Sequence, residues 1–140
     1  MEWRHSKMKV GLLIIAHERV ASALVETAEN MLGHCPLALA TLPVEGDCDP
    51  DATFERALNQ ARELDQGDGV LVLTDIFGST PSNIACRLAT DLSVAVVSGV
   101  NLPMLVRVMN YPDLQLRELA NKALSGGRDG VLECCEGTGR

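Results

Sequence analysis

The chain has 140 residues, of which 46% are hydrophobic and 22% are charged. This length and apolar content suit one folded domain with its own core and argue against a disordered chain. Twelve Lys and Arg residues against nineteen Asp and Glu residues give a net charge of −7, which disfavours nucleic acids and anionic membranes as partners because phosphate recognition depends on clustered cations.

The N-terminal half of the chain begins with a strand pattern. Residues Val10–Ala16 are continuously apolar, as in a strand covered on both faces of a parallel sheet, and this run is too short to span a bilayer. A helical repeat of apolar residues follows, with Gly33 as its predicted end. The sequence predicts a second strand at Leu37–Leu42. Asp49-Pro50 predicts the start of a second helix, as an N-cap followed by proline at the first helical position.

The second half repeats the alternation of strand and helix. Val70–Thr74 is the third predicted strand, and the Thr80-Pro81 step marks the start of the helix after it. Val94–Ser98 is the fourth predicted strand, and residues Gly99–Pro103 lead into another helix.

We expect a last helix over about 113–124, ended by Gly126-Gly127, and a short edge strand at Val131–Cys134. Strands and helices that alternate with short connections predict a doubly wound α/β domain with a mainly parallel sheet and helices on both faces. The predicted domain covers residues 9–133, with residues 1–8 and 134–140 as ragged termini.

The chain contains five cysteines but no C-x-x-C pair, so the sequence predicts neither a disulfide framework nor a zinc ribbon. The cysteines are Cys35, Cys48, Cys86, Cys134 and Cys135. Their use suits a reducing, cytoplasmic environment.

Two polar residues follow predicted strands at the sheet edge where ligands bind in this fold class. His17 follows the first strand and Asp75 follows the third. If these strands are neighbours, the two side chains can touch. An aspartate that accepts the Nδ1–H would fix the imidazole tautomer and leave Nε2 as a nucleophile. The plainer interpretations are a polar loop residue and a turn or cap residue.

The loop after Asp75 has features of an anion site. Gly78 lets backbone approach a ligand, and Ser79 and Thr80 stand at a helix start, where free N–H groups and a partial positive charge favour a phosphoryl group. A plain helix cap explains Thr80 equally well. A hydrolase in which Ser79 or Thr80 attacks and His17 acts as base is a further alternative, but Ser79 lacks the glycines of a nucleophile elbow.

Three segments resemble the signature segments of one family, the mannose-type IIA components of the bacterial phosphoenolpyruvate-dependent sugar phosphotransferase system. These segments are Ile14–His17, Leu73–Asn83 and Ser98–Leu105. The similarity covers roughly residues 9–131 in matching order and spacing.

The resemblance implies a phosphohistidine carrier. His17 matches the histidine that accepts phosphoryl from the phosphocarrier HPr and passes it to a IIB protein or domain. Asp75 matches the aspartate that orients this histidine, and Thr80 matches a hydroxyl residue that contacts the phosphoryl group. The family fold has strand order 2-1-3-4 plus an edge strand, usually in a homodimer, and its chemistry needs no metal or organic cofactor.

Two features depart from the family pattern. The family often has glycine directly after the histidine, where this chain has Glu18, and a carboxylate there could disfavour an incoming phosphoryl group. No IIB domain follows in the sequence, so we expect a separate IIB partner. Two alternatives stay open: a regulatory module that reports its phosphorylation state, and the phosphoryl-donor subunit of a dihydroxyacetone kinase.

Overall fold

The computed structural model describes residues 9–139 and builds them around a parallel sheet of four strands in the order β2-β1-β3-β4. The strands are β1 (Gly11–His17), β2 (Leu39–Val44), β3 (Val70–Thr74) and β4 (Val94–Ser98). This order confirms that the first and third strands are neighbours. Residues 1–8, predicted to be a ragged terminus, lie outside the described residues.

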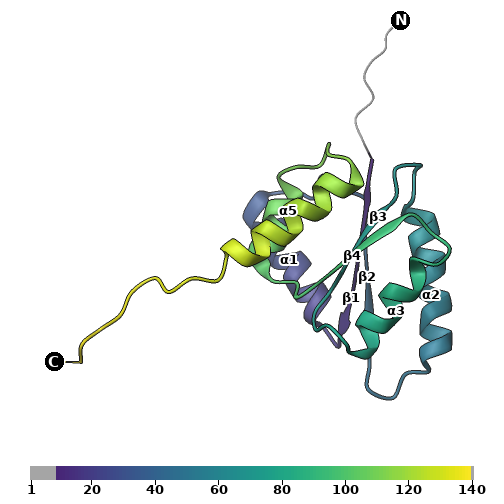
Figure 1. The fold of residues 1–140 in the computed structure, drawn as a ribbon, viewed down its shortest axis with the longest axis horizontal. Helices are drawn as coiled ribbons and strands as arrows, with labels where there is room; N and C mark the ends of the chain where they lie inside the picture. Colours follow the sequence, from purple (N-terminus) through teal and green to yellow (C-terminus); the bar gives the residue numbers. More distant parts are fainter. Residues whose placement is uncertain (1–8, 140) are drawn as a thin grey trace, which may run out of the picture.

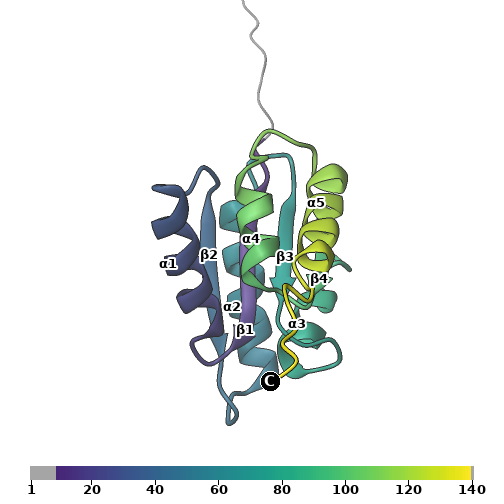
Figure 2. The same cartoon turned by 90° about the vertical axis from the view of Figure 1, so that its left-hand side faces the viewer.

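Five helices cover the two faces of the sheet, which confirms the predicted doubly wound fold. They are α1 (Val20–Leu32), α2 (Pro50–Leu64), α3 (Thr80–Leu88), α4 (Leu102–Met109) and α5 (Leu116–Asp129). Helices α1, α4 and α5 pack on one face, and α2 and α3 on the other (Figure 1, Figure 2). Alternate residues of β1 enter the two cores: Leu12 and Ile14 the first, Leu13 and Ile15 the second.

Local signals place several helix ends where the sequence predicts them. The Asp49 side chain accepts a hydrogen bond from the Asp51 N–H at 3.1 Å, and Pro50 is the first residue of α2. Helix α1 ends at Leu32, and Gly33 follows it with a φ of 86°, the left-handed conformation that glycine adopts freely. Within residues 9–139, no helix combines the length and the apolar composition needed to cross a bilayer.

The prediction for the last helix is wrong at both ends. Helix α5 begins at Leu116 and continues through Gly126-Gly127 to Asp129. The two glycines serve packing against α4, because a Cβ added at Gly126 would lie 2.8 Å from the Cβ of Arg107. The second strand is also displaced: it covers Leu39–Val44 where Leu37–Leu42 was predicted.

The edge strand predicted at Val131–Cys134 is wrong for the described chain. These residues have no regular secondary structure, and the segment extends away from the sheet (Figure 1). The Val131 and Leu132 side chains are 77% and 69% exposed. They therefore gain too little burial against the described chain to offset the entropy lost on ordering a strand.

Candidate functional site

His17 and Asp75 meet at the carboxyl ends of two neighbouring strands. His17 is the last residue of β1, and Asp75 directly follows β3. The pairing of Ile15 with Thr74 brings the two strand ends level. The His17 Nδ1 atom lies 2.9 Å from Oδ2 of Asp75, so the structure brings together the two side chains that the sequence analysis singled out.

The Asp75 carboxylate is held by three N–H groups. Its Oδ2 atom accepts both the His17 Nδ1–H and the His17 backbone N–H, each at 2.9 Å, and its Oδ1 atom accepts the Ile76 N–H at 3.0 Å. Burial raises the pKa of this carboxyl. The hydrogen bonds from His17 and the charge of the protonated ring lower the pKa by more than burial raises it, so the net shift is downward. The carboxylate therefore stays ionised and fixes the imidazole tautomer.

This tautomer directs the other ring nitrogen to an approaching reactant. With the proton on Nδ1, the neutral ring carries its lone pair on Nε2. Among the described residues, no hydrogen bond engages Nε2. The His17 side chain is 38% exposed and that of Asp75 is 12% exposed. The site thus has a partly buried orienting carboxylate behind an accessible nucleophile.

The loop from Gly78 to α3 lies at the same end of the sheet and leaves backbone donors free. Gly78 has a φ of 86°, which turns the chain into the helix. In the described chain, the N–H groups of Thr80 and Ser82 have no backbone acceptor, whereas Asn83 donates to the Ser79 carbonyl at 2.9 Å. Free N–H groups at a helix start favour an anion.

The hydroxyl groups of this loop do not form a hydrolase site with the histidine. The Ser79 Oγ–H donates to the Ile76 carbonyl at 2.6 Å, and it does not cap α3. Thr80 is exposed at the first position of the helix. No hydrogen bond of the described chain joins either hydroxyl to His17. A serine nucleophile activated by this imidazole is therefore not supported.

The third signature segment ties the ends of β3 and β4 together. The hydroxyls of Thr74 and Ser98 are 2.8 Å apart, and the Val100 N–H donates to the Thr74 carbonyl at 2.9 Å. Asn101 then caps α4 by accepting the Met104 N–H at 2.9 Å. These contacts fix the strand end from which Asp75 emerges.

Glu18 has a backbone conformation that the sequence analysis missed. Its φ of 50° makes it the one residue other than glycine with a positive φ in the described chain, and this region costs an L residue roughly 1 kcal/mol. Its N–H donates to the Val44 carbonyl at 3.1 Å, which holds the turn against β2. A signal for a sharp turn was present, because only two residues separate β1 from α1.

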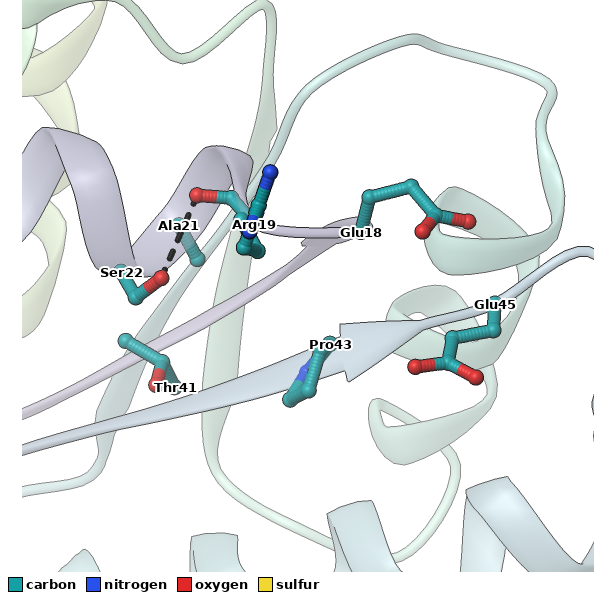
Figure 3. Close-up of a pocket in the computed structure, with 7 residues that line it drawn as sticks. All are labelled: Glu18, Arg19, Ala21, Ser22, Thr41, Pro43 and Glu45. Carbon is teal, nitrogen blue, oxygen red and sulfur yellow. Dashed lines mark hydrogen bonds between the residues drawn. The ribbon is translucent and has the colours of Figure 1, made fainter.

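A cleft of about 560 Å³ opens between the start of α1 and the end of β2. Its lining begins with Glu18 and Arg19, the two residues that follow His17. Figure 3 shows its lining, with Glu18 and Glu45 at one end and Ser22 and Thr41 at the other. The lining also includes Arg19, Ala21 and Pro43. The sequence carries no signal for this cleft, because it depends on how β2 packs beside α1.

Comparisons with known proteins agree on one family. Residues 11–124 match the family model described as "PTS system fructose IIA component". The chain is 34% identical over 127 residues to the PTS system mannose-specific EIIAB component of Escherichia coli strain K12, covering 89% of this chain but only 39% of that protein's length. It is 28% identical over 130 residues to the PTS system fructose-specific EIIA component of Bacillus subtilis strain 168, covering 91% of this chain and 88% of the relative.

The fold comparison gives the same result. The mannose/sorbose specific IIA subunit of the phosphotransferase system from Enterococcus faecalis superposes with a TM-score of 0.82 at 25% identity. The superposition covers 93% of this chain and 98% of that structure.

Proposed function

The chain belongs to the family of PTS system fructose IIA components, which are phosphotransferase components of sugar transport, and we propose that it carries phosphoryl groups on His17. In this proposal His17 accepts phosphoryl from phospho-HPr and passes it to a IIB partner. The hydrogen bond of 2.9 Å between His17 Nδ1 and Asp75 Oδ2 carries the proposal, because it leaves Nε2 as an exposed nucleophile.

The transfer balances without an added proton or cofactor. The lone pair of His17 Nε2 attacks phosphorus while the bond from phosphorus to the donor's imidazole nitrogen breaks. The donor ring leaves as neutral imidazole, since its other nitrogen keeps its proton. His17 becomes a phosphoimidazolium that keeps its Nδ1–H. The step to the IIB acceptor repeats this chemistry in the other direction, so catalysis consists of positioning and charge stabilisation.

Asp75 and the start of α3 have separate roles in this chemistry. The Asp75 carboxylate accepts the Nδ1–H and stabilises the cation that forms on the ring. The free N–H group and the hydroxyl of the exposed Thr80 offer donors for phosphoryl oxygens, and Gly78 and Ser79 form the loop that presents them.

Labelling tests this function. Incubation with phosphoenolpyruvate, enzyme I and HPr should give an acid-labile, base-stable phosphate on the protein. His17→Ala should remove the label, and His34→Ala serves as the matched control because His34 is an exposed histidine in the connection between α1 and β2, away from the site. A label that persists in His17→Ala would overturn the assignment.

We further propose that the protein acts in the cytoplasm as a homodimer. Strand β4 is a sheet edge, and the exposed apolar side chains of Val131 and Leu132 follow α5. Open strand edges and exposed apolar groups are features that a second copy would cover. Sedimentation of the protein should show a dimer, and a double change of Val131 and Leu132 to Asp should give a monomer. A wild-type monomer at micromolar concentration would contradict the proposal.

A further inference from the structure

Glu18 directly follows His17, and its charge forms no contact that stabilises the fold of the described residues. Its carboxylate takes part in none of the hydrogen bonds or ion pairs of the described chain, where the ion pairs involve His17, Arg87 and Arg107. In Figure 3 the Glu18 carboxylate and the Arg19 side chain point in different directions. The position therefore holds an uncompensated negative charge in a backbone conformation that favours glycine.

The two sides of His17 differ in charge. On the β3 side, the Asp75 carboxylate is compensated by three N–H groups, and the start of α3 offers free donors. On the β2 side, Glu18 is joined to Val44 by its backbone and shares one end of the cleft with Glu45 (Figure 3). A phosphoryl group on Nε2 is thus attracted from one side and repelled from the other.

From this asymmetry we infer that the Glu18 carboxylate destabilises the phosphorylated state of His17 and so favours onward transfer to the acceptor. The inference rests on the proposed function. A phosphoryl group carries about 1.5 to 2 negative charges at neutral pH, whereas the unphosphorylated ring carries none at Nε2. Repulsion from Glu18 therefore acts on the product of the loading step and not on its starting state.

The size of the effect follows from Coulomb's law. For a unit charge and a phosphoryl group held about 7 Å apart in a water-like medium, Coulomb's law gives a roughly four- to eightfold shift of the equilibrium, and we expect an effect of this order for the residue next to His17. Salt screens this repulsion, because the Debye length falls from about 30 Å at 0.01 M to about 3 Å at 1 M.

An equilibrium measurement isolates this effect from docking. The unmodified protein, Glu18→Gln and Glu18→Gly are each equilibrated with a fixed pool of HPr and phospho-HPr, and the phosphorylated fractions are read by phosphorus NMR. Neutralising Glu18 should raise the equilibrium constant for phosphorylation about fivefold at 0.01 M salt and less than twofold at 0.5 M. Glu18→Gln keeps the strained backbone and Glu18→Gly relieves it, so equal shifts identify the charge as the cause.

Glu63→Gln is the matched control. Glu63 is an exposed glutamate near the end of α2, at the opposite end of the sheet from His17. It should leave the equilibrium unchanged. An unchanged or lowered constant in Glu18→Gln, or an equal rise in Glu63→Gln, would overturn the inference. Absence of any phosphorylation in the unmodified protein would instead overturn the proposed function.

Discussion

Replacing Asp75 with Asn tests what the carboxylate does for the imidazole. Asp75 accepts three N–H groups, two of them from His17 on Oδ2 and one from Ile76 on Oδ1. An asparagine has one acceptor oxygen. It satisfies more donors when that oxygen takes the Oδ2 position and its NH₂ group faces the Ile76 N–H. Asp75→Asn should therefore keep the Nδ1–H tautomer while it loses the negative charge and the hydrogen bond from the Ile76 N–H.

The size of the loss follows from that charge. A hydrogen bond to a charged group contributes about 1.5 to 3 kcal/mol, and one between neutral groups about 1 kcal/mol. The charge develops on the ring as phosphorus bonds to Nε2, so the difference acts on the transition state. A loss of about 1.4 kcal/mol slows phosphorylation roughly tenfold. Asp75→Ala removes the acceptor altogether and should slow transfer more, without abolishing it.

Single-turnover labelling by phospho-HPr measures these rates. The expected order is the unmodified protein, then Asp75→Asn, then Asp75→Ala, with His17→Ala unlabelled. An Asp75→Asn rate within twofold of the unmodified protein would refute the argument that the carboxylate charge stabilises the phosphorylated ring.

Three further predictions concern stability. Glu18→Gly should raise the free energy of unfolding by about 1 kcal/mol in urea denaturation, because it relieves a left-handed φ of 50°; a less stable variant would contradict this. The pKa of Asp75 is lowered from its ordinary 3.8, so its stabilisation is full above that pH and is lost as pH falls through the lower folded-state value. The difference in the free energy of unfolding between the unmodified protein and Asp75→Asn should thus shrink as the pH is lowered. A difference that grows would contradict the stabilising role of the Asp75 charge. Gly126→Ala should destabilise the protein by roughly 1 kcal/mol or more, because its Cβ would lie 2.8 Å from the Arg107 Cβ. At Gly127 the one tight contact of an added Cβ, at 2.7 Å, is with the flexible end of the Met104 side chain, so Gly127→Ala should cost less in thermal unfolding.

The sheet was predictable because each strand carries its own local signal. The apolar runs Val70–Thr74 and Val94–Ser98 form β3 and β4 with the predicted bounds. The run that becomes β2 includes Pro43 and is less uniform, so its register is set by pairing with β1 and not by its own pattern. The end of the last helix was predicted wrongly because a glycine pair in sequence indicates a helix end. In the structure Gly126 and Gly127 lie within α5 and allow it to pack closely against α4.

The core of the site was predictable because it follows from topology. Parallel neighbours bring the residues after β1 and β3 to one edge, so His17 and Asp75 meet. The backbone of Glu18 and the cleft beside it were not predicted. The short connection between β1 and α1 indicates a sharp turn but not which residue takes the left-handed conformation. The cleft depends on the packing of α1 beside β2, which leaves no pattern in the residue types.

The identity of the phosphorylated nitrogen tests the central claim most directly. The protein would be labelled with ¹⁵N in its histidines, phosphorylated through enzyme I and HPr, and studied by NMR through the coupling of ring nitrogens to phosphorus. The geometry at Asp75 predicts one phosphoryl group, on Nε2 of His17, with the proton retained on Nδ1. A phosphoryl group on Nδ1, or on another residue, would contradict the account.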